Sequence, residues 1–197
     1  MNPIIDHYDK LIDENNDPVF DPPLLQEYMD KWDGKTFIEE LQLDNNKSIL
    51  EIGVGTGRLA IRTIPACGYF TGIDISPKTI KRANKNLASL QNKTLICIDF
   101  FDCVFTEQFD VVYSSLTFLH IKDKQKAFNK VAVFLKKGGR LVLSVSKDQS
   151  NELNINDRKL ALYPDTPGDT EKYMINSGLS VIKKIETEFA YVFVAIK

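Results

Sequence analysis

The chain has 197 residues, of which 43% are hydrophobic and 26% are charged, as in a globular domain long enough to bury one core. Its net charge of −2 and its scattered lysines argue against a nucleic-acid backbone as the main partner. No apolar run approaches the ~20 residues of a membrane span, and the N-terminus lacks the basic-then-apolar order of a signal peptide. We therefore expect a cytoplasmic protein that works without a membrane or nucleic-acid partner.

The three cysteines, Cys67, Cys97 and Cys103, lie in or beside apolar segments, and their number is odd. Only two histidines are present to complete a metal site with them. We therefore expect reduced, mostly buried thiols and no bound metal.

Residues 1–46 are expected to form a helical extension that precedes the main domain. Residues 6–12 favour a short helix, and the polar and proline-rich residues that follow predict an irregular lead-in. The next apolar residues recur at helical spacing and predict a helix, ended by Gly34, whose stripe packs on the core. The stripe consists of Leu24, Leu25, Tyr28, Met29 and Trp32. Thr36 and Glu39 then have the spacing of a capping box, which predicts a second helix through Leu43.

A glycine-rich loop follows the first predicted strand, residues 48–52. The loop has glycines at alternate positions, Gly53, Gly55 and Gly57, so its backbone is free to take positive φ and a ligand can approach it closely. A helix from about residue 58 to 65 should continue the chain. A dinucleotide-binding fold requires G-x-G-x-x-G, but the sixth position here is Arg58.

Strands and helices then alternate along the chain. Strands are predicted at residues 69–74, 94–98, 109–113 and 140–145, and helices at 76–90 and 122–135. Ser76 followed by Pro77 is a typical helix start, and Gly138 with Gly139 should end the later helix. The alternation predicts a doubly wound parallel sheet with right-handed crossovers.

The pattern changes after residue 145. Residues 146–167 are polar and predict a loop with a short apolar piece at 160–163, before a helix at 169–177 closed by Gly178. Two last strands, residues 179–185 and 189–196, are too close in sequence for a helical crossover. They should form a hairpin, which makes one edge of the sheet antiparallel.

The order of these motifs is similar to that of class I S-adenosylmethionine-dependent methyltransferases, and the resemblance covers residues 47–197. It rests on stretches that match the family pattern, namely ILEIGVGTGRLA at 49–60, GIDIS at 72–76, DF at 99–100, FDVVYSSLTFLHI at 109–121 and LKKGGRLVLSV at 135–145. The resemblance implies an α/β fold with a doubly wound, seven-stranded, mostly parallel sheet. It also implies one methyltransferase domain with S-adenosylmethionine as cofactor and S-adenosylhomocysteine as product.

The resemblance further implies a role for each residue of the cofactor site. Gly53, Gly55 and Gly57 would let the backbone pass close to the methionine part, and Glu51 would hold the loop and the amino group. Asp74 would accept hydrogen bonds from both ribose hydroxyls, and Ile75 would lie against adenine. Asp99 would accept from the adenine amino group, the Phe100 N–H would reach a ring nitrogen, and Ser114 would face the sulfonium. These positions follow predicted strands, where open α/β sheets bind ligands.

Two residues are candidates for the catalytic part of the site. His120, in the loop after the fourth predicted strand, is a general base or acceptor-orienting group, or a histidine that only caps a helix. Tyr8 is a candidate for closing an N-terminal lid over the cofactor, with its ring opposed to the sulfonium.

The absence of certain family motifs narrows the range of possible methyl acceptors. The residues after the fourth predicted strand, Ser114 to Thr117, are not the N/D-P-P-Y/F of nucleobase- or glutamine-methylating enzymes. The paired-glutamate loop of arginine methyltransferases and the acidic metal pattern of catechol-type enzymes are also missing. We therefore expect O- or N-methylation of a small molecule by a monomer or homodimer. A nicotinamide-dependent oxidoreductase and a non-catalytic cofactor-binding regulator remain alternatives.

Overall fold

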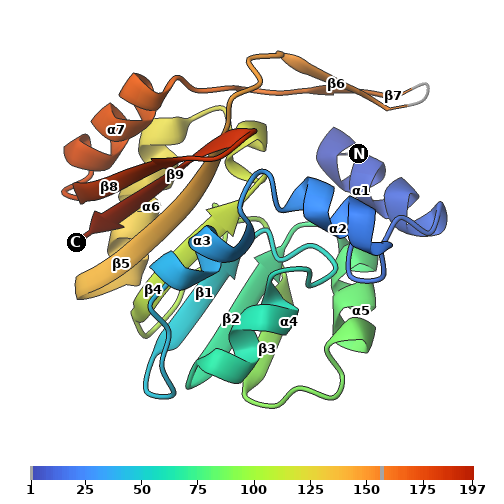
Figure 1. Ribbon diagram of the computed structural model, residues 1–197, viewed down its shortest axis with the longest axis horizontal. Helices are drawn as coiled ribbons and strands as arrows, with labels where there is room; N and C mark the ends of the chain where they lie inside the picture. Colours follow the sequence, from blue (N-terminus) through green and yellow to red (C-terminus); the bar gives the residue numbers. More distant parts are fainter. Residues whose placement is uncertain (1, 156–157) are drawn as a thin grey trace.

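The computed structural model describes residues 2–155 and 158–197 and is built on one large sheet (Figure 1). The sheet has seven strands in the order β3-β2-β1-β4-β5-β9-β8. The strands are β1 (Ser48–Ile52), β2 (Tyr69–Asp74), β3 (Lys93–Cys97), β4 (Phe109–Ser115), β5 (Leu135–Ser146), β8 (Ser180–Glu186) and β9 (Ala190–Ile196). Neighbours from β3 to β5 pair in parallel, whereas β9 is antiparallel to both β5 and β8. The predicted fold class, including the C-terminal hairpin, is confirmed.

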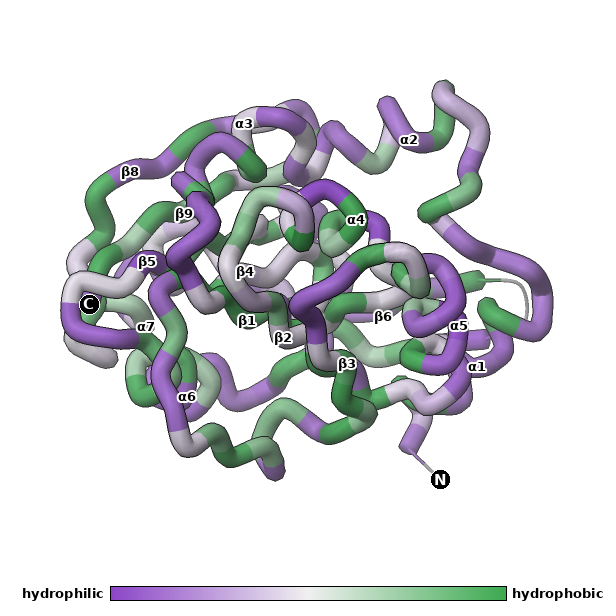
Figure 2. The backbone as a smooth tube through the Cα atoms, turned by 90° about the horizontal axis from the view of Figure 1, so that it is seen from below, coloured by the Kyte–Doolittle hydropathy of each residue, from purple (hydrophilic) through white to green (hydrophobic). Residues whose placement is uncertain are grey.

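Helices cover both faces of this sheet. The face carrying α6 (Lys124–Phe134) and α7 (Pro167–Asn176) packs on one apolar cluster. The face carrying α3 (Gly34–Glu40), α4 (Ala60–Thr63) and α5 (Pro77–Asn86) packs on another. Leu50 in β1 belongs to the first cluster and Ile49 to the second, because successive strand residues point to opposite faces. Figure 2 shows apolar residues of β1 and β2 near the centre and polar residues along α1 (Pro3–Asp13) and α5 at the periphery. Among the described residues, no helix has the length and apolar character needed to cross a membrane.

The N-terminal part forms three helices, α1 (Pro3–Asp13), α2 (Pro23–Met29) and α3 (Gly34–Glu40). The core-facing stripe predicted at residues 24–32 is wrong, since α2 has no buried residue and Leu24 remains 79% exposed. The helix ends before Trp32. The predicted capping box at Thr36 is also wrong, because α3 begins at Gly34 with Asp33, three residues before Thr36, as its N-cap.

Between β1 and β5 most predicted elements are present with shifted ends. The glycine loop leads to a short α4 (Ala60–Thr63) and a 3-10 turn, η1 (Ile64–Ala66). α5 (Pro77–Asn86) begins as expected, with the Ser76 hydroxyl accepting from the Thr79 N–H at 3.0 Å. The strict alternation of strands and helices is not observed, because turns without a helix connect β3 to β4. β5 starts directly after α6, so the two glycines at 138 and 139 lie within a strand rather than after a helix.

The region predicted as a loop at 146–167 contains a second, two-stranded sheet. It consists of β6 (Glu152–Ile155) and β7 (Arg158–Ala161), which pair antiparallel and extend from the body of the molecule toward α1 (Figure 1). Gly178 ends α7 with φ +79°, as expected for a helix C-terminus. Cys67 and Cys103 are buried and Cys97 is exposed, and all three thiols are free.

Candidate functional site

A cavity of about 420 Å³ lies at the carboxyl ends of β1 to β4, where the strand order reverses between β1 and β4. One wall comes from the chain before the sheet, and we call it the N-terminal wall. It consists of Asn2, Ile4, Tyr8, Leu11, Ile12, Asn16, Pro18 and Met29. The opposite walls come from the glycine loop, from the ends of β2 and β3, and from residues 115–122.

The glycine loop takes the backbone conformation that its composition allows. Gly53, Gly55 and Gly57 have φ of +78°, +56° and +102°. A Cβ on Gly55 would meet nothing within 4 Å, whereas one on Gly53 would lie 1.9 Å from the Thr117 hydroxyl oxygen. Gly53 and Gly55 line the cavity. Gly57 instead lies against Leu87, the C-cap residue of α5, whose side chain would be 3.0 Å from a Cβ on Gly57, so this glycine allows the loop to pack on the end of that helix.

Asp74, the last residue of β2, has both carboxylate oxygens bound to backbone amides. One oxygen accepts from the Gly55 N–H and the other from the Ser76 N–H, each at 3.0 Å. Burial raises the pKa of this carboxyl above its usual range, although these hydrogen bonds oppose the shift. Asp74 therefore fixes the glycine loop and keeps lone pairs for a ligand with two hydroxyl donors.

Asp99, Phe100 and Ile75, the residues predicted to contact adenine, also line the cavity. The Asp99 carboxylate accepts from the Phe101 N–H at 2.8 Å. The Phe100 ring is 9% exposed and packs against the rings of Phe101 and Phe118. Asp99 and Phe100 lie in the turn after β3, and Ile75 directly follows Asp74 at the end of β2.

Glu51 lies in β1 and lines the cavity at 3% exposure. The Tyr113 hydroxyl donates to its carboxylate at 2.9 Å. Burial raises the pKa of Glu51 to about 8, because the charged form is poorly solvated there, while the Tyr113 hydrogen bond and the nearby Arg58 limit the shift.

The prediction that Ser114 faces the ligand is wrong. Its side chain is fully buried, and its hydroxyl donates to the carbonyl oxygen of Ile52 in the neighbouring strand β1 at 2.7 Å. The neighbouring Ser115 lines the cavity instead, because adjacent strand residues point in opposite directions. Leu116, which follows, also lines the cavity and has φ +56°, a conformation that costs energy in a residue other than glycine.

The structure brings the two candidates for the catalytic part together across the cavity. The Tyr8 hydroxyl, from α1, lies 2.7 Å from His120 Nε2 in the 3-10 turn η2 (Phe118–His120). Burial lowers the pKa of His120 to about 4 and raises that of Tyr8, so both are neutral at pH 7. His120 Nδ1 is buried and has no hydrogen-bond partner among the described residues.

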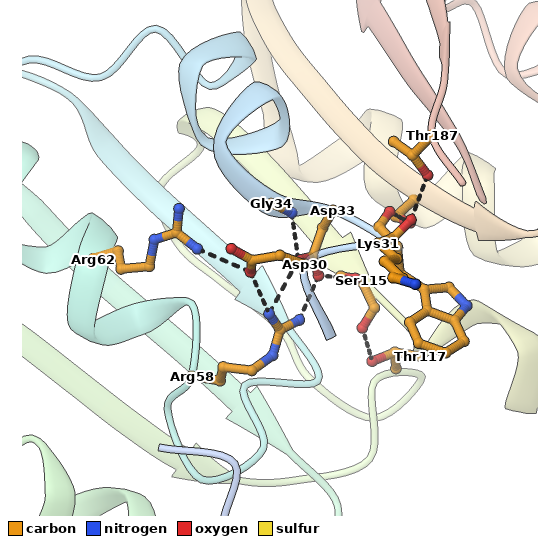
Figure 3. Close-up of polar contacts among 11 residues, drawn as sticks. Asp30, Lys31, Asp33, Gly34, Arg58, Arg62, Ser115, Thr117 and Thr187 are labelled. Carbon is orange, nitrogen blue, oxygen red and sulfur yellow. Dashed lines mark hydrogen bonds and ion pairs between the residues drawn. The ribbon is translucent and has the colours of Figure 1, made fainter. Parts of the chain in front are cut away.

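Sequence reasoning missed a charged network beside Glu51 (Figure 3). Asp33 accepts from both terminal nitrogens of Arg58, and Asp30 lies 3.5 Å from Arg58 Nη1. Arg58 lines the cavity, whereas Asp33 lies behind it. The sequence marks Arg58, because an arginine stands at the sixth position of the glycine loop. Nothing in the sequence near residue 33 marks Asp33 as the partner of Arg58.

The comparisons with known proteins agree with this arrangement. Residues 50–143 match the family model described as a methyltransferase domain. The chain is 33% identical over 115 residues to phosphoethanolamine N-methyltransferase 1 of Zea mays, covering 56% of this chain and 23% of that protein. It is 31% identical over 123 residues to an uncharacterized methyltransferase of Anoxybacillus flavithermus, covering 60% of this chain and 57% of that protein. The matches span less than half the length of the first three curated relatives.

Solved structures show the same fold over the whole chain. N-methyltransferase NodS of Bradyrhizobium japonicum, in complex with S-adenosylhomocysteine, superposes with a TM-score of 0.73 at 17% identity, covering 100% of this chain and 99% of that one. A methyltransferase of Clostridium acetobutylicum has a TM-score of 0.70 at 17% identity, covering 98% and 97%. The domain match, the sheet order and the position of the cavity agree with one another: residues 50–143 match a methyltransferase domain, and the chain has the fold of S-adenosylmethionine-dependent methyltransferases.

Proposed function

We propose that this chain binds S-adenosylmethionine in the cavity and transfers its methyl group to an oxygen or nitrogen atom of a small molecule. The observation that carries the proposal is the set of carboxylates at three adjacent strands. Glu51, Asp74 and Asp99 belong to β1, β2 and the turn after β3, and all line one cavity beside the glycine loop.

The residues present fit such a cofactor. Gly55 presents open space to the cavity, so a ligand is free to lie against the loop. The Thr79 hydroxyl, on a residue 3% exposed, lines the cavity and has no partner among the described residues. A buried hydroxyl without a partner is unfavourable by about 1–3 kcal/mol, so a polar ligand beside Asp74 would stabilise it.

When bound, S-adenosylmethionine supplies an electrophilic methyl group on a sulfonium. The chain's own residues would bind and orient this cofactor. Asp74 would accept from the ribose hydroxyls, Asp99 from the adenine amino group, and Glu51 from the ammonium of the methionine part. In-line transfer depends chiefly on such alignment and on exclusion of water.

A small acceptor is supported by the size of the cavity and by the N-terminal wall that covers part of it. The names of the relatives support either nitrogen or oxygen as the acceptor atom. The maize relative is an N-methyltransferase, and a relative from Ilyobacter polytropus, 32% identical over 120 residues, is named malonyl-[acyl-carrier protein] O-methyltransferase 2.

Tyr8 and His120 are proposed to orient the acceptor. With a pKa of about 4, the imidazole is neutral at pH 7 and is a weak general base. Its hydrogen bond to the Tyr8 hydroxyl instead fixes both side chains on the cavity wall. The pair is thus better suited to hold an acceptor hydroxyl or amine in line than to remove its proton.

The cofactor is tested by thermal unfolding with S-adenosylmethionine, S-adenosylhomocysteine, NADH and NADPH. A ligand at ~100 times its dissociation constant adds about 2.7 kcal/mol, which corresponds to a rise in Tm of ~5–10 °C for a chain of this size. We expect that rise with the two sulfur nucleosides, and no rise with them in Asp74→Ala. A rise in Tm only with a nicotinamide cofactor would overturn the proposed methyltransferase function and favour an oxidoreductase.

The acceptor side is tested with Tyr8→Phe and His120→Ala, once a methyl acceptor has been found by screening. We expect kcat to fall by roughly tenfold or more in each, because the acceptor loses its alignment, while cofactor affinity changes little. The two changes together should cost about as much as one, since they act as a unit. Unchanged turnover in His120→Ala would exclude this role, and cofactor binding without turnover on any acceptor would favour a regulator.

A further inference from the structure

Residues 30–33, which connect α2 to α3, are hydrogen-bonded to parts of the chain that are distant in sequence (Figure 3). The centre of this connection is Asp33, whose side chain is fully buried. One carboxylate oxygen accepts from the Gly34 N–H at 2.6 Å and from Arg58 Nη1 at 3.0 Å. The other accepts from Arg58 Nη2 and from the Ser115 hydroxyl, the latter at 2.7 Å.

The same segment is fixed to the C-terminal half of the sheet. The Lys31 carbonyl oxygen accepts from the Phe189 N–H at 3.1 Å and from the Thr187 hydroxyl at 2.7 Å. The Trp32 carbonyl oxygen accepts from the Ser144 hydroxyl at 2.6 Å. Asp33 is therefore held by the sheet, and in turn it holds Arg58 and Ser115.

Capping of α3 does not explain this arrangement. A cap requires one acceptor for the first N–H, and the Gly34 N–H takes only one contact. The remaining contacts go to Arg58 and Ser115, which both line the cavity. A buried carboxylate is tolerated only when it is well paired, so the two groups that compensate Asp33 are themselves fixed on the cavity wall.

Strand order locates this wall along the cavity. Asp99 follows β3, Asp74 ends β2, Glu51 lies in β1 and Ser115 ends β4, and these strands are consecutive neighbours in the sheet. In the proposed function Asp99 and Asp74 take the adenine and ribose. The part of the cofactor beyond the ribose, its amino-acid group, then lies toward β1 and β4, beside Glu51, Arg58 and Ser115.

We propose that Asp33 is a positioning residue of the cofactor site: it fixes Arg58 and Ser115 against the amino-acid end of the methyl donor. This inference rests on the proposed function. Arg58 retains N–H groups beyond the two that Asp33 accepts, so it is still able to donate to a ligand carboxylate. Asp33 acts through its neighbours, since it does not line the cavity itself.

The test compares two ligands that differ only in the amino-acid part. S-adenosylhomocysteine carries it, and 5′-methylthioadenosine has the same nucleoside and thioether without it. In calorimetric titrations, Asp33→Asn should lower the affinity for S-adenosylhomocysteine about tenfold or more. The affinity for 5′-methylthioadenosine should stay within about twofold, because only S-adenosylhomocysteine reaches Arg58 and Ser115.

Asp30→Asn is the matched control. Asp30 also lies near Arg58, at 3.5 Å, but its side chain is 41% exposed, so its exchange should change neither affinity by more than about twofold. Arg58→Lys keeps the charge and removes the two-pronged contact with Asp33, and it should reproduce the selective loss. This second variant tests the proposal even where Asp33→Asn does not fold.

The outcomes separate the two proposals. Failure of the wild-type chain to bind S-adenosylhomocysteine overturns the proposed function and this inference with it. Wild-type binding, with equal losses for both ligands or no loss in the Asp33 and Arg58 variants, overturns the inference alone. A selective loss of S-adenosylhomocysteine in those variants supports it.

Discussion

At the scale of single residues, Glu51 has the most unusual chemistry in the cavity. It is an acid in an apolar strand, 3% exposed, with the Tyr113 hydroxyl donating to it. Burial raises its pKa to about 8, whereas the ordinary value is 4.5. The folded chain therefore holds a proton on Glu51 that the unfolded chain has already released between these two pH values.

This difference predicts a pH dependence of stability. The contribution of Glu51 is fully present below pH ~4.5 and is lost as the pH rises toward 8, by at most about 1.4 kcal/mol per pH unit. Glu51→Gln removes the ionisation. In urea unfolding without ligand, the free energy of unfolding of this variant should therefore rise relative to that of the wild type from pH 5 to 9. Glu39→Gln, at an exposed position, is the control and should follow the wild type.

A constant difference between Glu51→Gln and wild type across this pH range would contradict the assignment. An S-adenosylmethionine ammonium beside Glu51 would favour its charged form. Cofactor binding near neutral pH should then release protons, which titration in buffers of different ionisation enthalpy would detect.

Individual site residues were predictable where local sequence marks them. Glu51 lies two residues before the first glycine of the loop and Asp74 ends β2, and the structure places both on the cavity. Ser114 was a wrong choice over Ser115, because a short buried strand does not reveal which of two adjacent serines faces the site. Asp33 was not found, since only folding brings it to Arg58 and Ser115.

At the scale of elements, α1 is held mainly by polar contacts at its two sides. On one side, Asp9 accepts from the Ser76 hydroxyl at 2.6 Å, at the start of α5. Asp17, after the helix, pairs with Arg82 of α5 at 3.0 Å. On the other side, Glu14 makes two contacts with Arg158 of β7, at 2.7 and 2.8 Å. The N-terminal wall thus depends on both α5 and the β6–β7 sheet.

Neither apolar cluster of the sheet includes a residue before Phe37. Removal of residues 1–21 should therefore leave a chain that still unfolds cooperatively. The truncated chain should lose the ~5–10 °C stabilisation by S-adenosylhomocysteine, because one wall of the cavity is gone. Circular dichroism would establish the fold, and undiminished stabilisation by the ligand would show that this segment is not part of the site.

The elements themselves were unequally predictable. The bounds of β1 and β2 were predicted to the residue, since short β-branched runs flanked by turn residues mark buried strands. The apolar residues of α2 were assigned to the core, yet Tyr28 contacts Trp32 and Phe189 at the surface. Periodicity identifies an apolar stripe but not what covers it.

At the scale of the whole molecule, the sheet order explains why the site lies where it does. β1 connects to β2 on one side and has β4 on the other, so the connections leave a crevice at their carboxyl ends. The fold class followed from alternating strands and helices with a final pair too close for a crossover. The N-terminal wall was foreseen only as a lid hypothesis for Tyr8, because no local pattern predicts where α1 lies relative to strands far along the chain.

The polar attachment of α1 gives the chain two levels of resistance to opening. The sheet between its two apolar clusters opens only with global unfolding, whereas α1 has to break only a few hydrogen bonds and ion pairs, some of them exposed to solvent. Amide protons of α1 should then exchange with deuterium much sooner than those of β1. A ligand held between the two slows exchange in α1 first, so the isotope pattern would distinguish occupancy of this cavity from general stabilisation.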